Sequence, residues 1–264
     1  MIAPDPPADL ASYDLIVLNT SGGKDSAVMC QYVADVARAA GAGDRMVAVH
    51  ATFPEEWPGT VDLVRRQTTA IGVPLEVVTR GEGLLDYARR RGKWPSPKQR
   101  WCTSDFKRAP IQKVITRRAP GQRRRARVLN VMGMRAAESP ARAKLLPFAR
   151  DRRKGLTNTR RATDTWLPIF RLSTPDVWRM VAHYGLEMHP AYAAGMPRLS
   201  CSFCIFAPRA ALLLAGRLRP EMLAEYVAVE RATGHRFRQD LALADVQAAL
   251  DAGEAPTTIS DWRM

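Results

Sequence analysis

The sequence contains no apolar run that approaches the roughly 20 residues of a membrane-spanning helix. Its first residues, MIAPDPPADL, lack the basic start and apolar stretch of a secretory signal. Cysteine is scarce, with four residues among 264, which argues against a disulfide-stapled scaffold. We therefore expect a cytoplasmic globular protein with no membrane partner, long enough to bury a substantial core.

Acidic residues are also scarce relative to basic ones: 26 Asp and Glu stand against 40 Lys and Arg, a formal net charge of +14. The excess lies between Arg89 and Arg161, where 24 basic residues meet three acidic ones. Arginine supplies 33 of the 40 bases, which fits a composition bias, but bias alone would scatter arginine and would not remove the acids. The segment favours contact with a phosphate-rich partner, either a nucleotide or a nucleic acid.

Compact apolar runs alternate with helical patterns along the first half of the chain. Strands are expected over 13–19, 46–51, 75–79 and 128–132, and helices over 25–40, 60–71, 84–91 and 104–118. The basic stretch 141–165 is expected to be a long loop, and helices are expected over 175–184, 208–218, 221–233 and 245–252. The pattern predicts an α/β fold with a mostly parallel sheet. We expect an α/β domain over 1–204 and a helical C-terminal extension over 205–264.

A glycine-rich loop joins the first predicted strand to the first predicted helix. It consists of Ser21, Gly22, Gly23, Lys24, Asp25 and Ser26. Backbone N–H groups in such a loop point into one concavity, and the helix N-terminus adds partial positive charge. The Walker A pattern fails because an aspartate follows the lysine, and the dinucleotide GxGxxG pattern fails as well. The loop therefore predicts an anion site of another kind.

The loop SGGKDS after a first strand resembles the pyrophosphate-binding loop of the ATP pyrophosphatase (PP-loop) families, which share an adenine nucleotide α-hydrolase-like fold. Other segments resemble the sulfonucleotide (PAPS/APS) reductases of that superfamily, in order from about residue 13 to residue 205. These segments are Trp101-Cys102 with Lys107 and Pro110; Gly133-Met134-Arg135 with Glu138, Ser139 and Arg142; and 166–169, Val177-Trp178, Tyr192, Gly195, Arg198 and 201–204.

Two departures separate the sequence from the reductases. Those enzymes resemble one another in a C-terminal Glu-Cys-Gly nucleophile, whereas no cysteine follows Cys204 here. Members with an iron–sulfur cluster show an adjacent cysteine pair where this sequence has Trp101-Cys102. Both departures favour relatives that adenylate a substrate and transfer sulfur, such as DNA phosphorothioation enzymes and tRNA thiolases.

The cysteines indicate metal or redox chemistry. Cys201 and Cys204 form a C-x-x-C pair that can chelate a metal or a cluster. The resemblance places Cys102 beside them, and three thiolates around a [4Fe-4S] cluster would leave one iron open to hold sulfide. The alternatives are zinc, with a fourth ligand such as His189, and free or packed thiols. Cys30, inside the predicted first helix, is expected to be a buried apolar residue.

The nucleotide site is expected to extend beyond the glycine loop. Arg135 and Arg142 follow the fourth predicted strand at the edge where open α/β sheets hold ligands, and two arginines can clamp phosphates. Gly133 and Glu138 belong to the same segment.

Four residues complete the description of the predicted site. Thr52 and Phe53 end the second predicted strand, where this fold receives adenine. Asp25 either helps to hold Mg²⁺ or caps the helix N-terminus. Lys107 would neutralise phosphate or leaving-group charge. The predicted catalytic residues are thus Lys24, Lys107, Arg135 and Arg142.

These features predict an ATP-dependent adenylating sulfurtransferase with Mg²⁺. Sulfur would come from the cluster or from a donor such as a cysteine desulfurase. The surplus of charge over 150–161 favours DNA or RNA as the acceptor. One alternative is a sulfonucleotide reductase that binds PAPS or APS and takes electrons from thioredoxin. Another is a nucleotide- or nucleic-acid-binding protein without turnover. The acceptor, the sulfur donor and the oligomeric state stay open.

Overall fold

The computed structural model describes residues 9–119, 124–153 and 155–259. The chain forms two compact units, and each unit combines separate parts of the sequence. The first unit comprises the chain up to Ala51, Gly59–Val78 and Ala109–His189, and the second comprises Thr52–Pro58, Thr79–Arg108 and the chain from Pro190 onward. The predicted division into 1–204 and 205–264 stays a prediction.

The first unit is built on a six-stranded sheet in the order β3-β2-β1-β4-β6-β5. The strands are β1 (Leu15–Asn19), β2 (Met46–Ala51), β3 (Leu75–Val78), β4 (Ala126–Met132), β5 (Phe148–Arg150) and β6 (Arg161–Trp166). All neighbouring strands are parallel except β5, which runs antiparallel to β6. The predicted α/β class with a mostly parallel sheet is confirmed.

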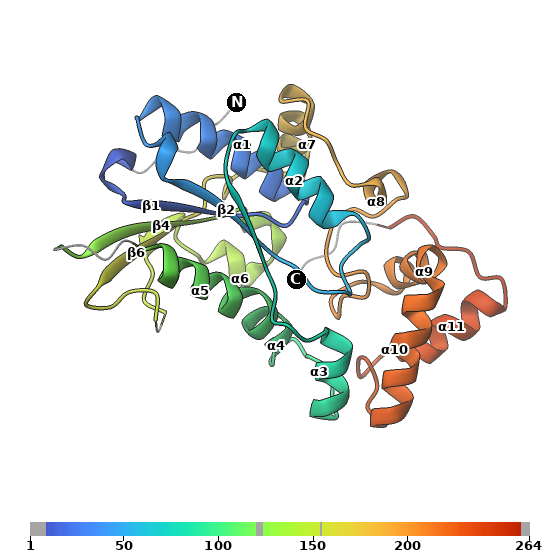
Figure 1. Cartoon of the computed structure of the whole chain (residues 1–264). Helices are drawn as coiled ribbons and strands as arrows, with labels where there is room; N and C mark the ends of the chain where they lie inside the picture. The colour runs from blue at the N-terminus through green and yellow to red at the C-terminus, as the bar shows by residue number, and fades with distance from the viewer. Residues whose placement is uncertain (1–8, 120–123, 154, 260–264) are drawn as a thin grey trace. The chain divides into compact units, whose positions relative to one another are not determined.

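Helices cover both faces of this sheet, with α1, α2 and α7 on one side and α5 on the other (Figure 1). Their bounds are Lys24–Ala39 for α1, Thr60–Ala70 for α2, Ala109–Arg118 for α5, Pro140–Ala143 for the short α6 and Thr174–His183 for α7. Side chains alternate along β1, so that Ile16 and Leu18 join the core under α1 and α7, whereas Leu15 and Val17 join the core under α5. Burial on both faces explains why the central strands read as continuous apolar runs.

The stretch 141–165 is not a long loop, so that prediction was wrong. It contains α6, β5 and β6, and β6 is almost fully buried. The sequence of β6, RATDTW, is polar, but its polar side chains have partners: Tyr13 Oη donates to Asp164 Oδ2 at 2.9 Å, and Thr163 Oγ1 donates to the Leu156 carbonyl at 2.7 Å. Paired polar groups can line a buried strand without the cost of an unmet hydrogen bond.

The second unit is helical and contains α3 (Leu84–Arg91), α4 (Trp101–Thr103), α8 (Pro190–Ala193), α9 (Arg209–Leu218), α10 (Pro220–Thr233) and α11 (Leu243–Asp251). Aromatic side chains fill its core, where Trp94 stacks on Tyr226 with ring centroids 5.4 Å apart. The helix predicted over 104–118 is divided, because Ser104–Arg108 forms a π-helical turn that continues from α4.

Short 3-10 helices complete the secondary structure at Leu10–Ser12, Gly43–Arg45 and Ala136–Glu138. In the part of the chain that the structure describes, no helix has both the length and the apolar character needed to cross a membrane.

Candidate active site

The glycine loop leaves β1 and enters α1 through a turn that its own side chains brace. Gly22 has φ of +72°, a conformation that favours glycine, and Gly23 occupies the N-cap position of α1. The Ser26 hydroxyl accepts from the Ser21 backbone N–H at 3.1 Å and donates to the Gly23 carbonyl at 2.9 Å. The first N–H groups of α1 have no partner within the helix. The loop therefore keeps the geometry of an anion site at the carboxyl end of β1.

A histidine on β2 contacts the residue that precedes the glycine loop. His50 is buried, and its Nδ1 lies 3.1 Å from the Thr20 carbonyl, one residue before the loop begins. Cys30 is also buried, as expected, and burial raises the pKa of its thiol to about 12, although a hydrogen bond with Thr20 acts in the opposite direction.

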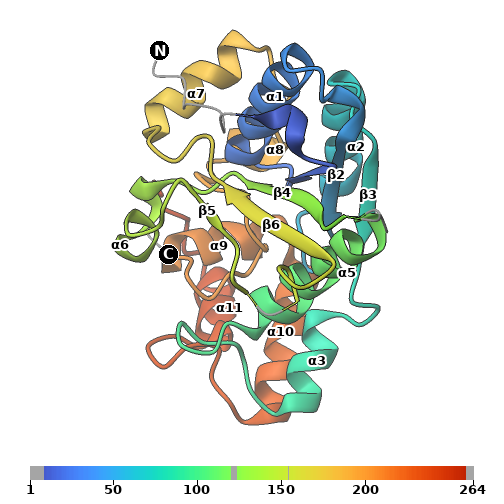
Figure 2. The ribbon, with the colours of Figure 1, turned by 90° about the vertical axis from the view of Figure 1, so that its left-hand side faces the viewer.

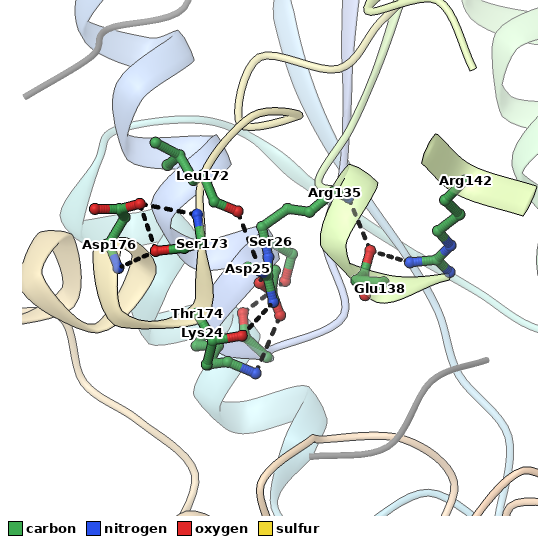
Figure 3. A network of polar contacts seen from close by, with 11 residues as sticks. Lys24, Asp25, Ser26, Arg135, Glu138, Arg142, Leu172, Ser173, Thr174 and Asp176 are labelled. Carbon is green, nitrogen blue, oxygen red and sulfur yellow. Dashed lines mark hydrogen bonds and ion pairs between the residues drawn. The ribbon is translucent and has the colours of Figure 1, made fainter. Parts of the chain in front are cut away.

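Asp25 contacts both Lys24 and Arg135, the two cations that the sequence analysis assigned to the phosphates of a nucleotide. Its carboxylate lies 3.3 Å from Lys24 Nζ and accepts from Arg135 Nε at 2.6 Å (Figure 3). Lys24 and Arg135 are both about 1% exposed, so the carboxylate balances two buried charges. Asp25 lies in the first turn of α1 and Gly23 holds the N-cap, so the capping alternative for Asp25 was wrong.

Arg135 is fixed at its far end by the segment that leads into α7. Its guanidinium donates to the Leu172 carbonyl at 3.2 Å and to Thr174 Oγ1 at 3.3 Å. Lys24 Nζ also lies 6.0 Å from the ring centroid of Trp178 on α7. Sequence reasoning did not single out Thr174, and it offered no signal that would have done so.

Glu138 organises the segment after β4. Its Oε2 accepts from the Arg135 backbone N–H at 2.8 Å and also contacts the Arg142 guanidinium (Figure 3). The Arg142 side chain is about 20% exposed, so part of it reaches solvent. The structure thus brings the predicted residues of this segment and of the glycine loop together in the first unit.

Gly133 allows this close approach of the segment to the loop. A Cβ atom added there would lie 3.0 Å from the Asp25 carbonyl oxygen and 3.1 Å from Ser26 Cα. Both contacts are to backbone, which cannot rotate away. A side chain at position 133 would therefore require the backbone of the glycine loop to shift by a few tenths of an ångström.

The second unit gathers the other predicted residues around Lys107. The electrostatic neighbours of this partly buried lysine are Cys201, Glu56, Cys204 and Cys102. Burial opposes the charge of Lys107, but these groups hold the pKa of its ammonium above the ordinary value. Burial also raises the pKa of the Cys201 and Cys102 thiols, an effect that Lys107 partly offsets.

Glu56 is a member of this cluster that sequence reasoning missed. It pairs with Cys201 in an isolated antiparallel bridge and accepts from Thr52 Oγ1 at 3.0 Å. The contacts join residues far apart in the sequence, which is why no local pattern revealed them.

The thiols do not form a ready metal site. Among residues 9–119, 124–153 and 155–259, no group of three or more His, Cys, Asp or Glu side chains is arranged to hold a metal ion. The residues as placed therefore do not fit an iron–sulfur cluster or zinc, and we derive no chemical step through either.

Thr52 and Phe53 belong to the second unit, where Phe53 is a core residue. Its ring packs edge-on against Phe106 with centroids 5.9 Å apart, and Lys107 Nζ lies 5.4 Å from its centroid. The predicted stacking of adenine on Phe53 stays a prediction.

Much of the basic stretch over 150–161 is occupied within the protein. Arg150 Nε lies 2.8 Å from Asp164 Oδ1, and Arg153 Nε donates to Asp151 Oδ1 at 2.8 Å. Arg161 is buried and donates to the Leu156 carbonyl at 3.0 Å, whereas Arg152 and Arg160 are exposed. Lys154 lies outside the described residues. The stretch thus offers a nucleic acid fewer charges than its sequence implies.

Known proteins resemble this chain over most of its length. One curated relative, an uncharacterized 37.8 kDa protein in the gpa 5' region of Escherichia phage 186, is 28% identical over 185 residues. The match covers 67% of this chain and 53% of the relative, so the chain spans about half the length of that protein.

Solved structures with a similar fold include a phosphoadenylyl-sulfate (PAPS) reductase from Candida auris, with a TM-score of 0.49 at 16% identity over 70% of this chain and 80% of that one. They also include a U34-tRNA thiolase from Methanococcus maripaludis with its [4Fe-4S] cluster, with a TM-score of 0.46 at 13% identity over 86% of this chain and 73% of that one. The sequence model of the phosphoadenosine phosphosulfate reductase domain matches residues 15–207. The chain belongs to the phosphoadenosine phosphosulfate reductase domain family, which its sequence motifs resemble.

Proposed function

We propose that this protein is an ATP-dependent adenylating sulfurtransferase that acts on a nucleic acid. The observation that carries the proposal is the glycine loop at the N-terminus of α1, with buried Lys24 beside it and Arg135 joined to it through Asp25. Backbone donors and cations that are fixed before the reaction are what stabilise charge on a departing pyrophosphate.

The first step would be an attack on ATP. An oxygen of the acceptor forms a bond to the α-phosphorus of ATP, the bond to the bridging oxygen of the β-phosphate breaks, and pyrophosphate leaves. The acceptor oxygen loses its proton to solvent if it carried one. Mg²⁺, bound by the phosphates, would neutralise part of the charge on pyrophosphate. Lys24 and the loop N–H groups would hold pyrophosphate. Arg142, whose side chain is partly exposed, would also reach it.

The second step would replace oxygen by sulfur. A donor supplies sulfur at the oxidation level of hydrosulfide, which attacks the activated atom of the acceptor. The bond from that atom to oxygen breaks and AMP leaves with the oxygen, so no electron donor is needed. We expect the hydrosulfide to be held beside Lys107 before it attacks, because a cation stabilises an anionic sulfur. The thiols of Cys102, Cys201 and Cys204 would keep their own sulfur and their oxidation state.

Exchange of labelled pyrophosphate into ATP tests the first step. We expect exchange in the presence of ATP, Mg²⁺ and a mixed nucleic-acid acceptor, and a loss of at least 100-fold in Lys24→Ala, in the range found when a transition-state donor is removed. Lys113→Ala, which changes an exposed lysine on α5, is the matched control and should retain exchange. Wild-type protein that binds no ATP and catalyses no exchange defeats the proposal.

The description of the family favours a second candidate, a sulfonucleotide reductase. That enzyme would release sulfite from PAPS or APS with reduced thioredoxin as the electron source. Sulfite formation without ATP, together with an absence of pyrophosphate exchange, decides for the reductase.

Metal content is tested separately from both reactions. Protein purified without oxygen and analysed for iron, sulfide and zinc, alongside Cys201→Ala, decides the cluster and zinc predictions. Several irons per chain that Cys201→Ala loses would establish a cluster and would require the thiols to rearrange from their present positions. Metal-free protein with full exchange activity removes both groups from the reaction.

A further inference from the structure

Exposed apolar side chains gather at one short segment of the first unit. Of the five large hydrophobic residues that are exposed in the described part of the chain, three lie within four positions: Leu145 at 41%, Leu146 at 68% and Phe148 at 44%. Val77 and Leu218 are exposed singly elsewhere. Apolar residues scattered singly are ordinary on protein surfaces, whereas three exposed ones within four positions of the chain favour a contact surface. We call Leu145, Leu146 and Phe148 the apolar step.

The register of the sheet places Phe148, at the end of the apolar step, beside the carboxyl ends of the parallel strands. The glycine loop lies at the same ends of the strands. Phe148 is paired with Trp166 on β6, Trp166 with Val131 on β4, and the next residue of β4, Met132, with Asn19 on β1. The glycine loop begins two residues after Asn19. Phe148 therefore lies three strands away from that loop, about 14 Å across the sheet.

Along the chain, the apolar step comes shortly after the segment that carries Arg135 and Arg142. After β4 the chain forms α6, which carries Arg142, and then passes through the apolar step into β5. β5 is the outermost strand of the sheet and lies alongside β6 (Figure 2). The apolar step is thus continuous with the residues that we assign to the nucleotide.

Basic side chains flank the apolar step. Lys144 immediately before it is exposed, and Arg150 shortly after it remains 45% exposed while it pairs with Asp164. One end of the apolar step therefore presents the charge of Lys144, the other presents an arginine whose charge Asp164 partly balances, and the middle presents a phenyl ring and two leucine side chains. Cations beside aromatic and apolar surface are typical of sites that hold phosphates and unstacked bases of a single strand.

We propose that the apolar step holds a nucleic-acid acceptor open beside the adenylation site, with Phe148 stacked on a base and the leucines wedged against its neighbour. This inference rests on the proposed function and names its substrate class, a single-stranded or locally unstacked nucleic acid. A base atom inside a stacked duplex cannot reach the α-phosphorus of a bound nucleotide, so an acceptor that reacts at a base must be opened. Inserted apolar side chains are a common means of opening a base step.

The test measures binding of a fluorescein-labelled single-stranded oligonucleotide by anisotropy. We expect Phe148→Ala and Leu146→Ser each to weaken binding roughly 10-fold, the effect of losing one base stack. Phe148→Trp should bind at least as well as wild type. The dependence of affinity on salt should keep its slope in all three variants, because no charge changes. Leu218→Ser, which changes another exposed leucine, 45% exposed on α9, is the control and should bind as wild type.

Two further measurements separate the possible outcomes. Pyrophosphate exchange by wild type reports on the proposed function: if exchange is absent but Phe148→Ala still weakens oligonucleotide binding, the apolar step stands and the adenylation proposal fails. If exchange is present and all variants bind the oligonucleotide as wild type, the apolar step is not an acceptor surface. Sedimentation of wild type and Leu146→Ser completes the test. A dimer that Leu146→Ser dissociates, with oligonucleotide affinity unchanged, would make the apolar step a contact between two copies of the chain and overturn the proposal.

Discussion

Arg135 donates from Nε to the Asp25 carboxylate at 2.6 Å, and this contact couples the segment after β4 to the first turn of α1. The same carboxylate lies 3.3 Å from Lys24 Nζ. One negative charge therefore sets the distance between two buried cations before any nucleotide binds. The pair that sequence reasoning assigned to phosphates is already organised by a residue that it assigned to Mg²⁺ or to a helix cap.

Asp25→Asn should destabilise the protein because it leaves two buried cations without their shared carboxylate. Breaking a buried ion pair from one side costs about 3–5 kcal/mol, and we expect a loss in this range from chemical denaturation. Asp62→Asn makes the same change in an exposed pair with Arg65 and should cost less than about 1 kcal/mol. Equal losses in the two variants would refute the coupling role of Asp25.

Gly133→Ala should displace the glycine loop, since the added Cβ would press on the backbone of Asp25 and Ser26. Overpacking of this kind costs about 1–3 kcal/mol, and we expect ATP affinity to fall with it, measured by calorimetry. Gly43→Ala is the matched control: its Cβ would be crowded only by Cγ of Arg38, in a side chain that can move, while the Arg38 Cα lies at an ordinary contact distance of 3.7 Å. An alanine at position 133 that binds ATP as wild type does would show that the close approach does not shape the loop.

Two arginines at opposite ends of the same basic stretch should behave differently. Arg161 is buried, and its guanidinium donates to the Leu156 and Gly155 carbonyls and to Thr116 Oγ1, so Arg161→Ala removes these buried hydrogen bonds and should lower the free energy of unfolding by about 2 kcal/mol. Arg152 is exposed, so Arg152→Ala should leave stability within about 0.5 kcal/mol of wild type. If Arg152 contacts a phosphate, its substitution should also reduce the salt slope of oligonucleotide binding by about one. If Arg161→Ala instead reduced the salt slope and Arg152→Ala lowered the stability, Arg161 would be the arginine that faces the ligand.

Cys30 should make the protein less stable in alkali. The ordinary pKa of the thiol is 9.0, and burial raises the pKa of Cys30 to about 12. Below pH 9 the thiol is protonated in both states and its contribution to stability is constant. Between pH 9 and pH 12 the unfolded chain loses this proton first, so stability falls by up to about 1.4 kcal/mol per pH unit.

The comparison that isolates this effect is wild type against Cys30→Ala. Urea unfolding of both proteins from pH 8 to pH 11 measures how much more stable wild type is than Cys30→Ala. This difference in the free energy of unfolding should shrink as pH rises, because only wild type carries this thiol. Other alkaline groups, such as Tyr13 with a pKa of about 12, are common to both proteins. A difference that stays constant across this range would mean that the thiol is not held neutral by burial.

The sequence predicted those parts of the fold in which neighbouring residues act together. β1 and β2 are continuous apolar runs, and the glycine loop follows β1 directly, so local patterns identified both the core strands and the anion site. β6 was missed because its polar side chains are satisfied by partners such as Tyr13, 151 positions away. Glu56 was missed for the same reason: its place beside Cys201 depends on chain folding that no short pattern encodes.

The interleaved construction of the second unit has a consequence for how the chain folds during synthesis. Phe53, Trp57, Trp101 and Phe106 belong to one core with residues of α9, α10 and α11, which are translated after them. The first unit receives its final segment by His189, so it can be complete while this aromatic surface still lacks its covering helices. Chains grow from their N-terminus and domains tend to fold in that order. The nascent protein therefore passes through a stage with a finished nucleotide-binding unit and an uncovered aromatic surface, the kind of surface that chaperones bind.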